Sequence, residues 1–163
     1  MSATKLVIYR GGIVRFHIPE NWREEYESTG GGTFFEEGAD TGTLRLNVLS
    51  FEDRGKRSTE TLQRFFRDRE AQVLQCGLSM RHYLTKTEEQ GTPLHIYRWE
   101  VLVPVPPSRY RLVCFSHTIF AARDGEARSR KELELVDRLV READYSTELG
   151  KVAKRPWWKL WRR

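Results

Sequence analysis

The sequence predicts a single α+β domain, an antiparallel β-sheet of about six to seven strands with helices packed on it. Three observations support this fold class. Residues 43–48 alternate between apolar and polar side chains, which is the pattern of a half-buried strand. Three β-prone runs, 80–87, 94–103 and 110–121, follow one another with short connections, which favour antiparallel neighbours. Apolar residues at helical spacing then close the domain over 133–143.

The N-terminal part is expected to contain two strand pairs. The runs 6–9 and 13–18 flank Gly11-Gly12, and glycine accepts the positive φ of tight hairpin turns. A second pair consists of 33–36 and 43–48, joined by a glycine-containing turn. Both pairs are therefore predicted to be antiparallel.

Between these two pairs, Pro19 ends the second strand, because proline has no N–H to donate to a neighbouring strand. Proline also fits the first turn of a helix. We therefore expect residues 19–27 to form a short helical or turn segment, with Trp22 and Tyr26 on one face because they are four residues apart.

Two longer helices are expected. The first runs from about 59 to 75, with Ser58 as N-cap and Gly77 as C-terminal stop. Its apolar stripe consists of Leu62, Phe65, Phe66 and Val73. The second helix begins with a capping box from Ser129 to Glu132, in which each side chain satisfies one free amide of the helix end. Its stripe consists of Leu133, Val136, Leu139, Val140 and Ala143, and the helical pattern ends near residue 145.

The chain divides into a domain, residues 1–148, and a basic, tryptophan-rich tail, residues 149–163. The tail holds six of the 28 lysines and arginines, three of the five tryptophans, and no acidic residue after Gly150. Removing those six leaves 22 basic residues against 23 acidic ones, so the net charge of +5 becomes −1 for the remainder. The basic character therefore belongs to the tail.

No motif in the sequence indicates a catalytic, metal or cofactor site, and we expect a protein that is not an enzyme and uses no cofactor. The four histidines, His17, His82, His95 and His117, fall on separate predicted strands, whereas metal sites usually show closely spaced ligands. Cys114 is three residues from His117, which places the two on opposite faces of one strand. Cys114 lies in an apolar run and is expected to be a buried, reduced thiol.

One segment resembles a known fold group. Phe16-x-Ile-Pro-x-x-Trp22 joins a strand to an aromatic anchor, and an amphipathic helix closes the domain. With this order of elements the chain resembles the PsbP/Mog1-like fold over roughly residues 14–143. The resemblance implies a non-enzymatic binding or assembly module, similar to the small bacterial members of that group. It carries over no functional residue.

The first candidate contact surface is a protein-contact surface made of Trp22, Glu24, Glu25 and Tyr26. Its aromatic pair has two interpretations. The favoured one is a hydrophobic plug at one end of the sheet, because large aromatic side chains supply much of the burial in a core. The other is an aromatic lip beside acidic residues, which suits a partner with basic residues.

The second candidate surface is the tail, with the contact residues Lys154, Arg155, Trp157, Trp158, Lys159, Leu160, Trp161, Arg162 and Arg163. Tryptophan prefers the membrane–water boundary and basic residues are drawn to anionic headgroups. A membrane surface and a protein groove are equally favoured as its target, and folding back onto the domain follows closely. Nucleic acid is the least favoured, because the near-neutral domain offers no basic track.

These observations predict a cytoplasmic, non-catalytic, adaptor-like binding or assembly module. Its tail engages an anionic membrane surface or an acidic protein partner, with peripheral contact at the inner membrane face. The cytoplasmic expectation rests on a start without a signal-peptide pattern and on the lack of the ~20 apolar residues that a membrane span needs. The alternative is a partner-specific inhibitor or immunity-type protein that acts through its sheet edge or through Trp22 and Tyr26.

Overall fold

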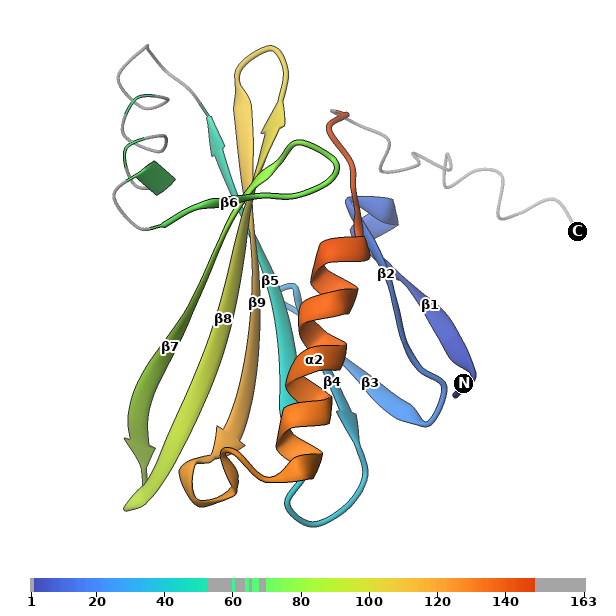
Figure 1. Ribbon diagram of the computed structural model, residues 1–163. Helices are drawn as coiled ribbons and strands as arrows, with labels where there is room; N and C mark the ends of the chain where they lie inside the picture. Colours follow the sequence, from blue (N-terminus) through green and yellow to red (C-terminus); the bar gives the residue numbers. More distant parts are fainter. Residues whose placement is uncertain (1, 53–59, 61–63, 65, 68–69, 149–163) are drawn as a thin grey trace, which may run out of the picture.

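The computed structural model describes residues 2–52, 60, 64, 66–67 and 70–148. The tail and most of residues 53–69 lie outside this description. The strands and helices, drawn in Figure 1, are β1 (Thr4–Tyr9), η1 (Arg10–Gly12), β2 (Val14–Pro19), β3 (Trp22–Glu27), β4 (Gly31–Glu36), β5 (Thr43–Glu52), β6 (Gln72–Val73), β7 (Ser79–Glu89), β8 (Thr92–Val105), β9 (Arg109–Phe120), η2 (Ala121–Arg123), α2 (Ala127–Glu142) and β10 (Asp144–Tyr145).

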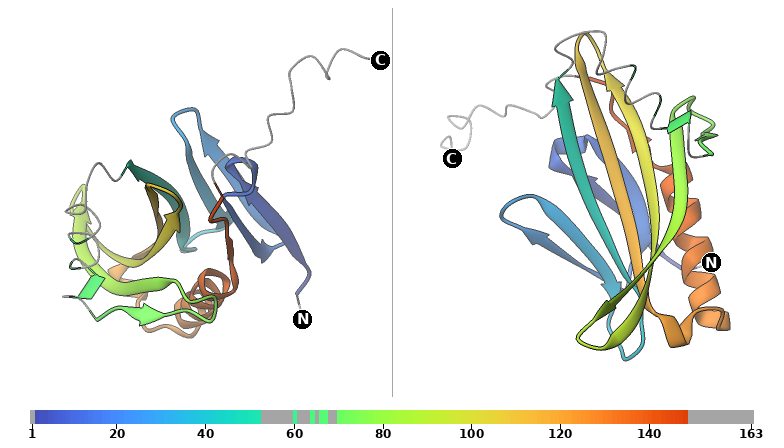
Figure 2. Two further views of the ribbon diagram at one scale, coloured as in Figure 1. Left: turned by 90° about the horizontal axis from the view of Figure 1, so that it is seen from above. Right: turned by 90° about the vertical axis from the view of Figure 1, so that its left-hand side faces the viewer.

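Two antiparallel sheets make up the fold. The larger has seven strands in the order β3-β4-β5-β9-β8-β7-β6, and the smaller has three in the order β1-β2-β10. The four long strands β5, β9, β8 and β7 form the centre of the larger sheet, which curls into an open arc when seen from above (Figure 2). The expected antiparallel α+β architecture is therefore confirmed.

One face of the larger sheet packs against α2 and the β1–β2 hairpin. Val136 and Val140 of α2 are buried in the same core as Phe115 of β9 and Phe16 of β2. The rings of Phe16 and Phe115 meet edge to face, with centroids 5.4 Å apart. Figure 1 shows α2 lying along the sheet beside the hairpin. The core thus sits between the sheet and these two elements.

The four-residue spacing of Trp22 and Tyr26 predicted a short helical or turn segment over residues 19–27. That prediction is wrong for most of the segment. Residues 22–27 form β3, which pairs with β4 so that Trp22 lies opposite Glu36 and Tyr26 opposite Gly32. An interval of four residues places two side chains on one face in a strand as well as in a helix. The pattern therefore could not distinguish the two, and strand pairing decides the outcome.

The helix expected to end at residue 75 ends earlier. Glu60, Arg64, Phe66 and Arg67 are helical, whereas Gln72 and Val73 form β6, which pairs with β7. Val73 is 74% exposed and is not part of a buried stripe, while Leu74 is only 5% exposed. Leu62, Phe65 and the proposed N-cap Ser58 lie outside the described residues.

The prediction of a capping box at the start of the last helix is also wrong. The helix begins at Ala127, two residues before Ser129, and its N-cap Glu126 makes no side-chain capping bond. Ser129 is a buried residue inside the helix. Glu132 is therefore not required at the helix end, and it contacts the sheet instead. After the helix, Asp144 and Tyr145 form β10 beside β2, where the sequence showed no pattern.

The other expected strands are confirmed. β1 and β2 form the hairpin around Gly11-Gly12, and β7, β8 and β9 run antiparallel to one another. In β5 the side chains of Leu44, Leu46 and Val48 all point into the core, as the alternation predicted. None of the helices in the described part of the chain is long and apolar enough to cross a membrane.

Candidate functional site

The predicted contact residues of the tail, 154–155 and 157–163, all lie outside the described residues. Ser146 and Glu148, near the end of the described chain, are hydrogen-bonded to a residue close to the start of β9. The guanidinium of Arg111 donates to the carbonyl oxygen of Ser146 at 2.8 Å and to that of Glu148 at 3.2 Å. Residues 146–148 therefore lie beside the end of the sheet where β9 starts.

Trp22 does not belong to an accessible contact surface. Its side chain is 5% exposed and packs in the core, as the favoured plug interpretation predicted. Its backbone carbonyl accepts a hydrogen bond from the Lys5 ammonium at 2.6 Å. The aromatic-lip interpretation is wrong for this residue, because large apolar side chains at the end of a sheet are buried where a hairpin packs on them.

The remaining members of that surface lie on the edge strand β3. Tyr26 is 54% exposed, and its hydroxyl donates to Glu24 Oε2 at 2.6 Å. Glu24 also forms an ion pair with Lys5 at 3.1 Å. The hydrogen bond from Tyr26, followed by that from Lys5, lowers the pKa of the Glu24 carboxyl against the opposing effect of burial. Glu25 is exposed. An acidic edge with one exposed tyrosine is therefore available on β3.

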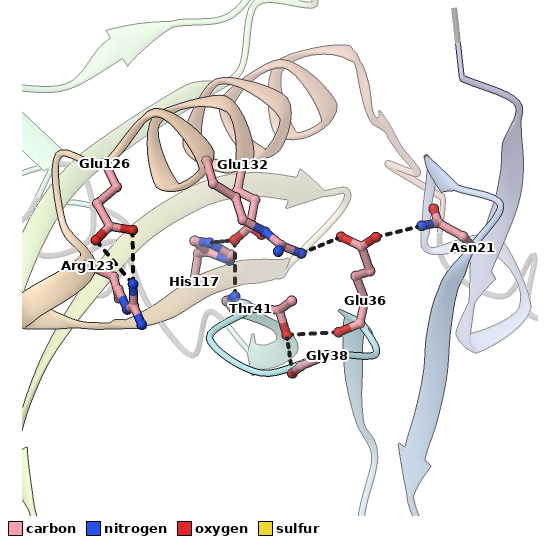
Figure 3. Close-up of polar contacts among 10 residues, drawn as sticks. Asn21, Glu36, Gly38, Thr41, His117, Arg123, Glu126 and Glu132 are labelled. Atoms are coloured by element: carbon pink, nitrogen blue, oxygen red, sulfur yellow. Dashed lines mark hydrogen bonds and ion pairs between the residues drawn. The ribbon is translucent and has the colours of Figure 1, made fainter.

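A buried histidine and a glutamate join α2 to the sheet (Figure 3). His117 of β9 is completely buried, and its Nε2 lies 3.4 Å from Glu132 Oε2 of α2. This separation falls within the range of an ion pair. In the described part of the chain, neither ring nitrogen of His117 has a partner in hydrogen-bond geometry. The same carboxylate oxygen accepts a hydrogen bond from the Gly42 amide at 3.0 Å.

Gly42 permits this approach. A Cβ at this position would lie 2.3 Å from His117 Cε1 and 2.7 Å from Glu132 Oε2, which is closer than real atoms approach. Burial raises the pKa of Glu132, but contacts with His117, the Gly42 amide and Arg128 outweigh it, so that the pKa is lowered overall. Arg128 extends the network, since it contacts Glu132 at 3.4 Å and Glu36 at 3.0 Å.

The network ties elements together, and a small surface hollow of about 270 Å³ lies beside Glu36, Arg128 and Glu132. The network links α2, β9 and the β4–β5 turn, and Asn21 adds the β2–β3 turn through a 3.0 Å hydrogen bond to Glu36 (Figure 3). No short-range pattern indicates this network, because Gly42 and Glu132 are 90 residues apart. The local pattern at Glu132 indicates only a capping box.

A second histidine cluster lies on β8. His95 Nδ1 lies 2.5 Å from Asp124 Oδ2, and the Tyr97 hydroxyl lies within 3.0 Å of both oxygens of the same carboxylate. Burial raises the pKa of Asp124, but the contacts with His95 and Tyr97 outweigh it and lower the pKa overall. No group of three or more His, Cys, Asp or Glu residues suited to a metal ion occurs among the described residues.

The face of the larger sheet that points away from α2 carries most of the polar side chains, and we call it the open face. Strand register places its residues in rows across β5, β9, β8 and β7. From the end where β9 finishes, the rows are Phe120, Leu94 and Thr87; then Thr43, Thr118, Ile96 and Thr85; then Arg45, Ser116, Arg98 and Tyr83; then Asn47, Cys114, Glu100 and Arg81. Phe66 packs on Leu102 and Leu112 farther along.

The last of these rows contains a buried ion pair. Arg81 and Glu100 are in direct contact, and the Tyr83 hydroxyl donates to Glu100 Oε1 at 2.8 Å. Cys114, next to Glu100, is a free and half-buried thiol, and burial followed by the charge of Glu100 raises its pKa to about 11. His117 points to the other face of β9, as the spacing of the two residues predicted.

A groove of about 480 Å³ crosses the first two rows of the open face and reaches Arg45. Its lining combines apolar side chains with several hydroxyl groups, and two carboxylates lie at its rim: Thr41, Thr43, Arg45, Thr87, Glu88, Glu89, Leu94, Ile96, Thr118, Ile119 and Phe120. This lining suits a ligand that is partly apolar and partly charged. The alternation of residues 43–48 placed Arg45 opposite the core, but it could not show which strands would lie beside it.

Comparisons with known proteins support the fold alone. A protein of Bacteroides thetaiotaomicron has a similar structure, with a TM-score of 0.58 and 15% identity, over 90% of this chain and 49% of its own. LpqN of Mycobacterium tuberculosis, described as involved in cell envelope biogenesis, matches with a TM-score of 0.58 and 12% identity over 80% of this chain and 81% of its own. This chain thus spans about half the length of the Bacteroides chain. No protein-family model matches the sequence, and no curated protein matches it.

Proposed function

We propose that this protein is a non-catalytic binding or assembly module that holds a partner on the open face of its curved sheet. The observation that carries this proposal is the groove of about 480 Å³ on that face. It is lined by half-exposed apolar side chains such as Phe120 and by a cationic side chain, Arg45, on rigid central strands. A rigid scaffold with a mixed apolar and charged groove is typical of a binding site.

The polar clusters of the domain favour binding over catalysis. Glu132 is engaged by the Gly42 amide and Arg128, and Glu100 is engaged by Arg81 and Tyr83. These carboxylates hold elements together. We propose that the tail adds a second, electrostatic contact with an anionic membrane surface or an acidic partner, peripheral and at the cytoplasmic face. We retain the PsbP/Mog1-like assignment as part of the same proposal.

A second candidate function is a partner-specific inhibitor or immunity-type protein that acts through the β3 edge. It is favoured by the exposed Tyr26 beside Glu24 and Glu25 on β3, whose outer edge pairs with no other described strand. An unpaired edge is a ready template for another strand, and carboxylates on it select a partner with basic residues.

One cross-linking experiment tests both functions. A photoreactive amino acid is placed in cells at Thr118 on the open face, at Glu25 on the β3 edge, or at the exposed Glu134 of α2 as the matched control. The open-face proposal expects one discrete adduct from position 118 and none from positions 25 and 134. An adduct from position 25 alone would support the inhibitor function. Equal labelling at all three positions would contradict both functions.

A further inference from the structure

We propose that the groove on the open face binds the carboxyl-terminal end of an extended peptide, with its terminal carboxylate between Arg45 and Arg98. The ligand's last residues are apolar and a basic residue precedes them. This inference rests on the proposed function, in which the open face is the binding surface, and it specifies the chemistry of the partner.

Two arginines in one row of the open face mark the end of the groove where the ligand carboxylate would bind. Arg45 of β5 lies opposite Ser116 of β9, and Ser116 lies opposite Arg98 of β8. Because neighbouring strands are about 4.8 Å apart, the two arginine backbones are separated by about 10 Å with only a small serine between them. Long guanidinium side chains can close on a carboxylate across such a gap, and Arg pairs with carboxylates in a bidentate manner.

These two arginines keep their charge available. No carboxylate in the described ranges forms an ion pair with Arg45 or Arg98, whereas Arg81 in the next row is paired with Glu100. Among the described residues, these two positive charges beside the groove have no ion-pair partner. A single carboxylate can accept hydrogen bonds from both guanidiniums and also offset their charge, whereas a neutral ligand brings no charge.

Between the arginines and Phe120, the lining of the groove suits a peptide better than an alkyl chain. Ile96, Leu94 and Phe120 supply apolar contacts, but Thr43, Thr87 and Thr118 bring hydroxyl groups to the same groove. A peptide has an amide N–H and a carbonyl at every residue to bond to these hydroxyls, and an alkyl chain would leave them unsatisfied. From Ser116 to Phe120 the strand advances about 13 Å, the length of four extended peptide residues.

The far end of the groove carries the opposite charge. Glu88 and Glu89 line it near the β7–β8 turn, and both are exposed. They repel an anion, so the ligand carboxylate is directed toward Arg45 and Arg98. They attract a basic side chain three or four residues before the ligand's terminus. The groove therefore has a direction that matches a basic residue followed by apolar residues and a free carboxylate.

The test measures binding of two synthetic peptides to the full chain by isothermal titration calorimetry. One peptide is N-acetylated Lys-Leu-Phe-Leu with a free carboxylate, and the other has the same sequence with a C-terminal amide. We expect the acid to bind on the order of tenfold more tightly than the amide, because a charge-assisted pair is lost. Arg45→Gln and Arg98→Gln should each reduce this difference, while the control Arg130→Gln, an exposed arginine on α2, should preserve it in full.

Thermal unfolding of each variant verifies that it is folded, and the acid–amide comparison on the unmodified chain does not depend on any variant. Equal binding of acid and amide would overturn the inference while leaving a peptide-binding open face. Binding of sodium laurate without binding of the peptides would overturn it in favour of a fatty carboxylate. Absence of binding by all probes would also overturn it, and a persisting adduct from position 118 would show that the proposed function survives.

Discussion

Glu132 is one of the residues that fix α2 to the sheet. Its side chain is only 13% exposed, and it meets the buried His117 ring, the Gly42 amide and Arg128 at once. A carboxylate taken from water into such a position is stable only when its oxygens are well satisfied. The lowered pKa of Glu132 indicates that these contacts favour its ionised form in the folded protein.

We therefore predict that Glu132→Gln lowers the free energy of unfolding by about 1–3 kcal/mol at neutral pH, the range for a lost hydrogen bond to a charged group. Because the folded-state pKa is below the usual value of 4.5, the stabilisation is fully present above about pH 4.5 and disappears as the pH falls through the folded pKa. Urea denaturation of both proteins between pH 3 and 7 measures the change.

The matched control is Glu134→Gln, on the exposed side of the same helix. It should change stability by less than about 0.5 kcal/mol at every pH, as exposed substitutions usually do. A Glu132→Gln effect that stayed constant down to pH 3 would contradict a charge-based role and indicate packing alone.

At the scale of the element, β6 shows how strand pairing overrides a helical pattern. Val73 and Leu74 are adjacent, yet Val73 points to solvent and Leu74 into the core. The Leu74 amide also bonds to the Leu78 carbonyl at 2.9 Å, in a turn that needs Gly77 at a φ of +85°. The chain therefore makes a tight corner here, where a continuous helix would have buried Val73.

This corner predicts opposite results for two neighbouring substitutions. Leu74→Ala should lower the free energy of unfolding by about 2–4 kcal/mol, because it leaves a cavity in the core. Val73→Ala should change it by less than about 0.5 kcal/mol, since the side chain is exposed. Chemical denaturation of the two variants decides between a strand and a helix, because the helical pattern would assign the larger loss to Val73.

The elements that were predicted from the sequence are those with a local signal. Residues 44, 46 and 48 alternate strictly, and the turn at Gln90-Gly91 separates β7 from β8 within a few residues. β3 was missed because the interval from Trp22 to Tyr26 fits helix and strand alike. β10 has only two residues and depends on β2, far away in the sequence, for its pairing.

The candidate site was less predictable than the fold, for the same physical reason. The row that joins Arg45, Ser116 and Arg98 arises only from the pairing of three strands. The contact between Gly42 and Glu132 crosses 90 residues. Neither has a short-range signature, whereas the composition of the tail stands out in a single window of the sequence.

At the scale of the whole molecule, the described fold is complete at β10. Tyr145 is buried, its hydroxyl donates to the Val140 carbonyl at 2.6 Å, and the Ser146 amide donates to the Ile13 carbonyl at 3.0 Å. These contacts close the smaller sheet against the core. The domain of residues 1–148 should therefore be stable without the tail.

Two truncations test this division. Removing residues 149–163 should leave the melting temperature within about 2 °C of the full chain, since a 1 kcal/mol loss would shift a domain of this size by roughly 2–4 °C. It should also abolish sedimentation with vesicles that contain phosphatidylglycerol, because the net positive charge is removed. Sedimentation that is unchanged by the truncation would contradict a membrane role for the tail.

Removing residues 144–163 is the matched comparison. This longer truncation also deletes Tyr145, and loss of a buried aromatic side chain costs about 3–5 kcal/mol. We expect a large fall in the melting temperature. If both truncations destabilised the protein equally, the boundary of the folded domain would lie within the tail.

The hydrogen bonds from Arg111 to Ser146 and Glu148 also determine how far the end of the described chain lies from the groove. The last described residues lie beside the start of β9, while the groove lies at Thr118–Phe120, near the end of that strand. Seven to nine residues of strand separate the two, which amounts to roughly 24–30 Å. The paired strands therefore act as a spacer of fixed length between residue 148 and any partner held in the groove.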